Sequence, residues 1–130
     1  MRSLFPEAAP VVTVEQLAGL LRRYRFPVSD ELAFQNALAR VLSEHGIAHE
    51  RERQLGPWGT VDFYLPAERL GIELKVKGSP SAVTRQLHRY VQSPEIEALM
   101  LVTWRAALGR LPARLHDKPL TVVALWEAGV

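Results

Sequence analysis

Three charged side chains lie in two segments whose other residues have the apolar character of buried strands. Asp62 belongs to the run VDFYL, and Glu73 and Lys75 belong to the run GIELKVK. Because side chains alternate across a strand, Glu73 and Lys75 point to the same face of the second run. A hairpin formed by the two runs could bring Asp62 near Glu73, although the sequence does not give the register of the pairing.

This pattern suits metal-assisted chemistry on a phosphate. Two carboxylates close together in a partly buried site repel each other, and a divalent cation removes that penalty. Mg²⁺ prefers oxygen ligands and is usually held by one or two carboxylates, water and a phosphate. Lys75 could contact the phosphate or the attacking water, or act as a base if its pKa is lowered. Singly, Asp62 could be an edge residue and Glu73 and Lys75 a surface ion pair. Together the three favour phosphodiester hydrolysis.

These residues resemble the signature of the PD-(D/E)xK nuclease superfamily. The pattern of that family has an acidic residue at the opening of the second core strand and Glu-x-Lys in the third. Asp62 matches the first position, and Glu73 and Lys75 match the other two. Thr60-Val61-Asp62 lacks the proline of the nominal motif, which is a departure from the pattern.

The resemblance implies a fold, a cofactor and a substrate. It implies an α/β fold with a mixed central sheet flanked by helices and a restriction-endonuclease-like core of order αβββαβ. Asp62 and Glu73 would bind Mg²⁺, or Mn²⁺ as a substitute, with the carbonyl of Leu74 as a further ligand. Lys75 would orient or activate the water, and DNA would be cut to a 5′-phosphate and a 3′-hydroxyl.

Members of the superfamily often add a glutamate from the preceding helix as a metal ligand. Glu31 matches this position, in the first turn of an expected helix, and Glu44 near its end is the less favoured substitute. The alternative for Glu31 is purely structural, because the helix dipole favours glutamate near a helix N-terminus.

A second element of the resemblance lies downstream. Gln86 and Tyr90 fit the Gln-x-x-x-Tyr element of RecB-like and lambda-exonuclease-like members, and their spacing places them on one helix face. Gln86 would contact a phosphate or a metal-bound water, whereas Tyr90 could be either a DNA contact or a core residue. Basic side chains nearby suit the phosphate backbone, unless they form only a solvated face; they are Lys77, Arg85 and Arg89.

The expected elements that position these residues follow the order ααβββαβ(α)β, which predicts an α/β fold with a mixed sheet flanked by helices. Thr13 and Gln16 form a capping box for a first helix that ends before Pro27. A second helix begins at Ser29 or Asp30 and stops at Gly46. Strands are expected over 47–55, 61–65, 71–77, 98–104 and 120–126, a turn over 56–59 and a helix over 81–91, with 111–115 ambiguous. We therefore expect one domain over 1–130, with a helical extension (1–28) and a nuclease core (29–126).

Composition excludes several classes of protein. The chain has 130 residues, 48% hydrophobic and 23% charged, and no cysteine, so thiolate metal sites and disulfides are excluded. Its net charge of +2 is mild support for an acidic partner. No run is long and apolar enough for a membrane helix, and no secretory signal is recognised. We expect a cytoplasmic protein encoded by a bacterium, an archaeon or a phage.

Several functions remain open. The length and the Glu…Asp…Glu-x-Lys order resemble stand-alone Holliday-junction resolvases, which act as homodimers on branched DNA. The Gln-x-x-x-Tyr element instead favours a RecB-like exonuclease or a flap-cutting repair nuclease. A restriction-type enzyme would need base-reading loops, and a non-catalytic nucleic-acid-binding module would be expected to lack a catalytic position. No phosphate-binding loop or His-Glu-x-x-His motif occurs.

Overall fold

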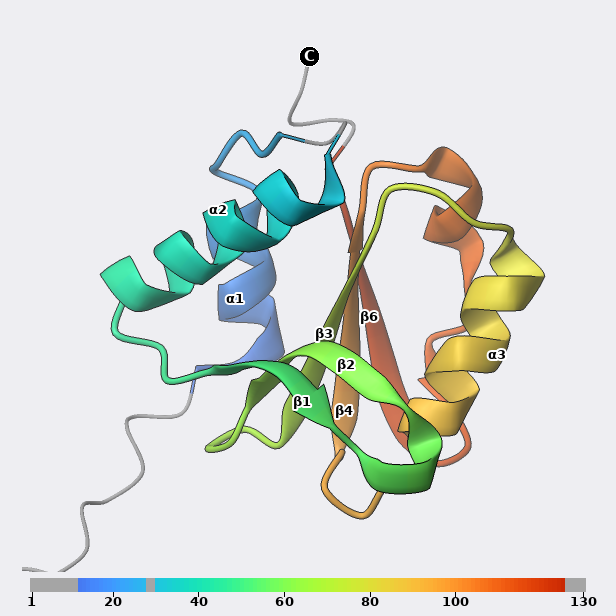
Figure 1. The fold of residues 1–130 in the computed structure, drawn as a ribbon. Coiled ribbons are helices and arrows are strands. Elements are labelled where there is room, and N and C mark those ends of the chain that lie inside the picture. The colour runs from blue at the N-terminus through green and yellow to red at the C-terminus, as the bar shows by residue number, and fades with distance from the viewer. Residues whose placement is uncertain (1–11, 28–29, 126–130) are drawn as a thin grey trace, which may run out of the picture.

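A computed structural model of the chain describes residues 12–27 and 30–125. In this part, a mixed six-stranded sheet lies between two layers of helix (Figure 1). Helices α1 (Val14–Leu21) and α2 (Glu31–Glu44) cover one face, and α3 (Pro80–Tyr90) covers the other. The structure confirms the expected α/β class with a mixed sheet flanked by helices.

The sheet combines an antiparallel hairpin region with a parallel region. Its strands lie in the order β1-β2-β3-β4-β6-β5. The pairs β1–β2, β2–β3 and β5–β6 are antiparallel, whereas β3–β4 and β4–β6 are parallel. The bounds are β1 Glu50–Gln54, β2 Thr60–Leu65, β3 Leu70–Lys75, β4 Ala98–Thr103, β5 Arg114–Leu115 and β6 Lys118–Ala124. From α2 to β4 the element order is therefore the expected αβββαβ.

Each helix begins at a residue whose side chain satisfies free backbone N–H groups. Thr13 and Gln16 form the predicted capping box at α1. The Asp30 carboxylate accepts from two amides in the first turn of α2, and the Ser79 hydroxyl accepts from one at the start of α3. Pro80 follows in the first turn of α3, where its missing N–H costs nothing.

Several element bounds differ from the sequence-based expectation. The strand expected over 47–55 is shorter, and the one expected over 71–77 ends at Lys75, since the chain turns through Gly78 (φ 118°) to reach α3. The ambiguous segment 111–115 contributes the two-residue strand β5. The turn over 56–59 includes a short 3-10 helix, Gly56–Trp58. The tail at 1–10, the alternative cap Ser29 and Trp126 lie outside the described residues.

Two apolar clusters sandwich the sheet. One joins α1 and α2 to side chains such as Phe63, Leu74 and Val123, and the other joins α3 to Val61, Tyr64 and their neighbours. Helix α1, expected as an extension, packs in the same cluster as α2 and contacts β6. Within the ranges 12–27 and 30–125, no helix is long and apolar enough to cross a membrane.

Candidate active site

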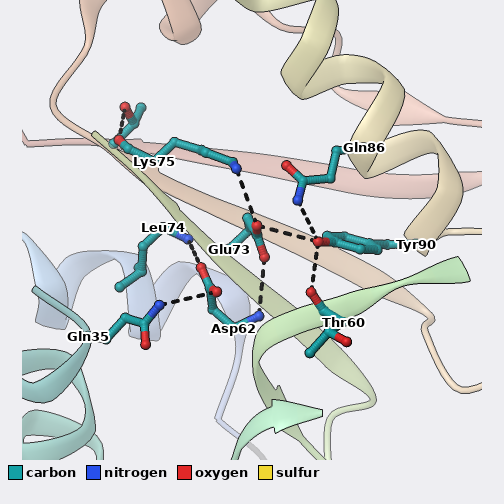
Figure 2. A network of polar contacts seen from close by, with 9 residues as sticks. Gln35, Thr60, Asp62, Glu73, Leu74, Lys75, Gln86 and Tyr90 are labelled. Carbon is teal, nitrogen blue, oxygen red and sulfur yellow. Dashed lines mark hydrogen bonds and ion pairs between the residues drawn. The ribbon is translucent and has the colours of Figure 1, made fainter. Parts of the chain in front are cut away.

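The register of the β2–β3 hairpin brings Asp62 and Glu73 together. Phe63 pairs with Ile72, and Asp62 and Glu73 are the next residue along each strand. The Asp62 amide donates to Glu73 Oε1 at 3.1 Å, and the Leu74 amide donates to Asp62 Oδ2 at 2.9 Å (Figure 2). Each carboxylate is therefore held by the backbone of the opposite strand.

Lys75 is the cation of this group. Its Nζ lies 3.6 Å from Glu73 Oε2, so the two side chains that alternation predicted on one face form an ion pair. The Glu73 side chain is 4% exposed and that of Lys75 is 21% exposed. The Thr103 hydroxyl on β4 donates to the Lys75 carbonyl at 2.8 Å and so fixes the end of β3. The ammonium group thus lies between a buried carboxylate and solvent.

The two carboxylates are poorly solvated, and this changes their proton affinity. Burial raises the pKa of Glu73 to about 8, with the negative charge of Asp62 as the second cause. Burial is also the largest cause of the raised pKa of Asp62, against which the hydrogen bond from the Leu74 amide acts. One Lys75 ammonium does not balance a buried and a half-buried carboxylate, so the pair favours either a proton or a further cation.

Helix α3 contributes Gln86 and Tyr90, which are joined to each other and to the carboxylate pair. Gln86 Nε2 donates to Tyr90 Oη at 2.8 Å, and Tyr90 Oη donates to the Thr60 carbonyl at 2.8 Å. The same oxygen lies 3.4 Å from Glu73 Oε2 (Figure 2). Because a phenol has one proton, Tyr90 Oη donates either to the Thr60 carbonyl or to Glu73, and the shorter distance favours Thr60.

Tyr90 is buried in the core. The residue is 1% exposed, which favours the core role among its two expected roles. Burial raises the pKa of its hydroxyl, and the charge of Glu73 adds to the effect. Lys77, Arg85 and Arg89 are exposed, which leaves both of their expected roles open.

Helix α2 supplies a contact that the sequence analysis missed. Gln35 Nε2 donates to Asp62 Oδ1 at 3.3 Å, and Gln35 Oε1 accepts from Arg51 of β1. The predicted ligand Glu31 is exposed one turn earlier on the same helix, and its charge raises the pKa of Asp62. The i, i+4 spacing from Glu31 was a usable signal for Gln35.

A second missed residue is Glu52 on strand β1. Its φ is 50°, a left-handed conformation that is uncommon outside glycine. Arg51 bonds to side chains of α2, whereas Arg53 stacks over Tyr64 on the α3 face, so the alternation of faces breaks at Glu52. The charge of Glu52 also raises the pKa of Asp62. No pattern in the sequence marked this break.

The donor set fits a hard divalent cation. Asp62 and Glu73 present carboxylate oxygens, the ligands that Mg²⁺ prefers, and two carboxylates suffice because Mg²⁺ retains water. In 12–27 and 30–125, no three His, Cys, Asp or Glu side chains gather into a group that could hold a metal. Glu31 is therefore not assembled with the pair into a three-carboxylate centre.

Comparison with protein-family models, with curated proteins and with solved structures gives no match to this chain.

Proposed function

We propose that this protein is a magnesium-dependent DNA nuclease that hydrolyses phosphodiester bonds. The observation that carries the proposal is the direct contact of Asp62 and Glu73 across the β2–β3 hairpin, with Lys75 paired to Glu73. A poorly solvated carboxylate pair that is short of positive charge has a physical reason to take up a cation. The resemblance of these three residues to the PD-(D/E)xK signature supports the same assignment.

Asp62 and Glu73 would hold the Mg²⁺, or Mn²⁺ in its place. By the resemblance, the Leu74 carbonyl is a further ligand and Glu31 acts through water. When bound, the ion supplies positive charge to the phosphate in the transition state. Its charge also compensates the repulsion that raises the pKa of Glu73.

Four other side chains of the site orient the reacting groups or the two carboxylates. Lys75 orients the attacking water or the scissile phosphate through its ammonium group. Gln86 and Tyr90 are positioning residues, because they hold the Glu73 carboxylate from the α3 side. Gln35 holds Asp62 from the α2 side in the same way. Both carboxylates are thereby oriented before substrate binds.

Two DNA substrates are candidates. A branched substrate, cut by a homodimeric Holliday-junction resolvase, is favoured by the length of the chain and the order of its acidic residues. A RecB-like exonuclease or flap-cutting activity is favoured by a specific contact, since Gln86 and Tyr90 reach Glu73 as one connected group. The two activities differ in the products that they leave.

The deciding experiment is cleavage of four matched synthetic DNAs: a four-way junction, a flap, a duplex and a single strand. We expect Mg²⁺-dependent cleavage that is abolished in Asp62→Ala and Glu73→Ala. Glu44→Ala, at an exposed glutamate of α2, is the matched control and should cleave normally. Glu31→Ala, on the same helix, should lower the rate if Glu31 contacts the ion through water.

The products separate the alternatives. Symmetric cuts in the junction indicate a resolvase that acts as a dimer, whereas cleavage of flaps or single strands alone indicates end processing. DNA binding without cleavage of any substrate would overturn the nuclease assignment and leave a non-catalytic nucleic-acid-binding module.

A further inference from the structure

Two of the four histidines contact each other outside the candidate active site. His88 lies on α3, and His116 lies in the connection between β5 and β6. His88 Nδ1 and His116 Nε2 are 3.0 Å apart, and the two rings meet edge to face with their centroids 4.5 Å apart. His45 and His49 have other partners, the Tyr24 hydroxyl and the Ile47 carbonyl. The fold thus brings together two imidazoles that are 28 residues apart.

The distance between the two nitrogens suits a shared metal ion. In the hydrogen bond, one proton lies between them, because each nitrogen must be either donor or acceptor. A metal ion that replaces this proton binds imidazole nitrogen at about 2.0–2.1 Å. If the N–metal–N angle lies between the square (about 90°) and tetrahedral (about 109°) values, the two nitrogens are about 2.9–3.4 Å apart. The observed 3.0 Å lies within this range.

We propose that His88 and His116 form a binding site for one divalent transition-metal ion of the zinc, nickel and copper class. Imidazole is a preferred ligand of these metals, whereas Mg²⁺ prefers oxygen. Water completes the coordination, since no third His, Cys, Asp or Glu joins the pair among the described residues. The site is independent of the carboxylate pair in both its residues and its choice of metal.

An ion at this site would tie the β5–β6 hairpin to helix α3. Lys118 of β6 already makes such a link, because its Nζ donates to the carbonyls of Val91 and Ser93 just beyond the end of α3. His116 is exposed and His88 is half-buried, so an ion can reach the pair from solvent. Because only the folded chain holds the two rings together, binding would stabilise the folded state.

The test is calorimetric titration of the untagged full chain with Ni²⁺ or Zn²⁺, with excess Mg²⁺ present to occupy the carboxylate pair. We expect one ion per chain and a rise in Tm on binding. His88→Gln and His116→Gln should each weaken the binding at least tenfold, while His49→Gln, the matched control, should leave it unchanged. Equal Tm values of all variants in EDTA would show that the substitutions leave the fold intact.

Two results would overturn this site: no saturable binding, or binding that is unchanged in both His88→Gln and His116→Gln. If either variant does not fold, the site is tested in the wild-type chain. The measurement is then NMR of its imidazole signals during titration with Cu²⁺. We expect paramagnetic broadening of His88 and His116 first. Earlier broadening of His45 or His49 would place the ion elsewhere and refute the proposal.

Discussion

At the scale of single residues, Glu73 is the carboxylate of the candidate site whose pKa burial raises to about 8. It is almost completely buried, faces Asp62, and has one cationic partner, Lys75. Burial of a carboxylate favours its neutral form. Without a bound cation, its ionisation therefore opposes folding.

The free energy of unfolding should fall as pH rises between about 4.5 and 8 in the absence of divalent metal. Across this window the unfolded chain releases the Glu73 proton near the usual value of 4.5, whereas the folded chain keeps it until about 8. The expected slope is roughly 1 kcal/mol per pH unit from this group. Urea unfolding in EDTA at pH 5 and pH 8 measures it.

Glu73→Gln should flatten this profile, because the amide does not ionise, and only the contribution of Asp62 remains. Glu44→Gln is the matched control and should keep the wild-type slope. Parallel profiles for the wild type and Glu73→Gln would contradict the raised pKa. Mg²⁺ at pH 8 should stabilise the wild type more than Glu73→Gln.

Substitution of Lys75 separates two roles of its ammonium group under the proposed function. Lys75→Met should lower the cleavage rate by about 10²–10⁴ if the group takes part in proton transfer. Lys75→Arg keeps the charge but does not lose a proton at working pH. An Arg variant as slow as the Met variant indicates proton transfer, and a partly active one indicates orientation by charge. Wild-type activity of Lys75→Met would exclude Lys75 from catalysis.

At the scale of elements, the connection from β1 to β2 determines where Tyr90 of α3 can lie. Gly59 has φ 103° and ψ −164°, a region that is populated almost only by glycine. A Cβ at this position would lie 3.1 Å from Tyr90 Cε1. The turn therefore needs glycine both for its backbone and for the approach of the Tyr90 ring.

Gly59→Ala should destabilise the protein by roughly 1–3 kcal/mol, through backbone strain together with displacement of Tyr90. Gly56→Ala is the matched control, since Gly56 also has a positive φ (65°) but has open space at its Cβ. We expect a smaller loss there, measured by urea unfolding. Cleavage should fall in Gly59→Ala alone, because Tyr90 positions Glu73. Equal losses in both variants would argue against the contact with Tyr90.

At the scale of the whole molecule, positive and negative charges are nearly balanced. The net charge is +2, so DNA affinity must come from local cations rather than from the overall field. Helix α3 carries exposed Arg85 and Arg89, and Lys77 precedes it. Helix α1, which ends beside Arg22, covers the opposite face of the sheet.

DNA binding by the cleavage-deficient Glu73→Ala protein should weaken with salt. Replacing Lys77, Arg85 or Arg89 by Gln should lower the salt slope by about one for each phosphate contact that is lost. Arg22→Gln is the matched control and should leave the slope unchanged. Fluorescence anisotropy over a series of salt concentrations measures these slopes. An equal effect of Arg22→Gln would show that α3 is not the DNA-binding side.

Features that depend on neighbours along the chain could be predicted from the amino-acid sequence alone. The caps at Thr13 and Asp30 and the alternation that pairs Glu73 with Lys75 are local, and all are present in the structure. The class of fold followed from the order of such segments. The hairpin of the two strands was also expected from their short connection, but its register, which places Asp62 beside Glu73, came from the structure.

The face of the sheet on which each helix packs could not be predicted in this way, and the rest of the site depends on it. The contact of Gln35 with Asp62, the burial of Tyr90 against Glu73 and the meeting of His88 with His116 all join segments that are distant in sequence. Periodicity predicts the apolar side of a helix but not its partner. The partner is selected by packing of the whole core, which is a property of all the elements together.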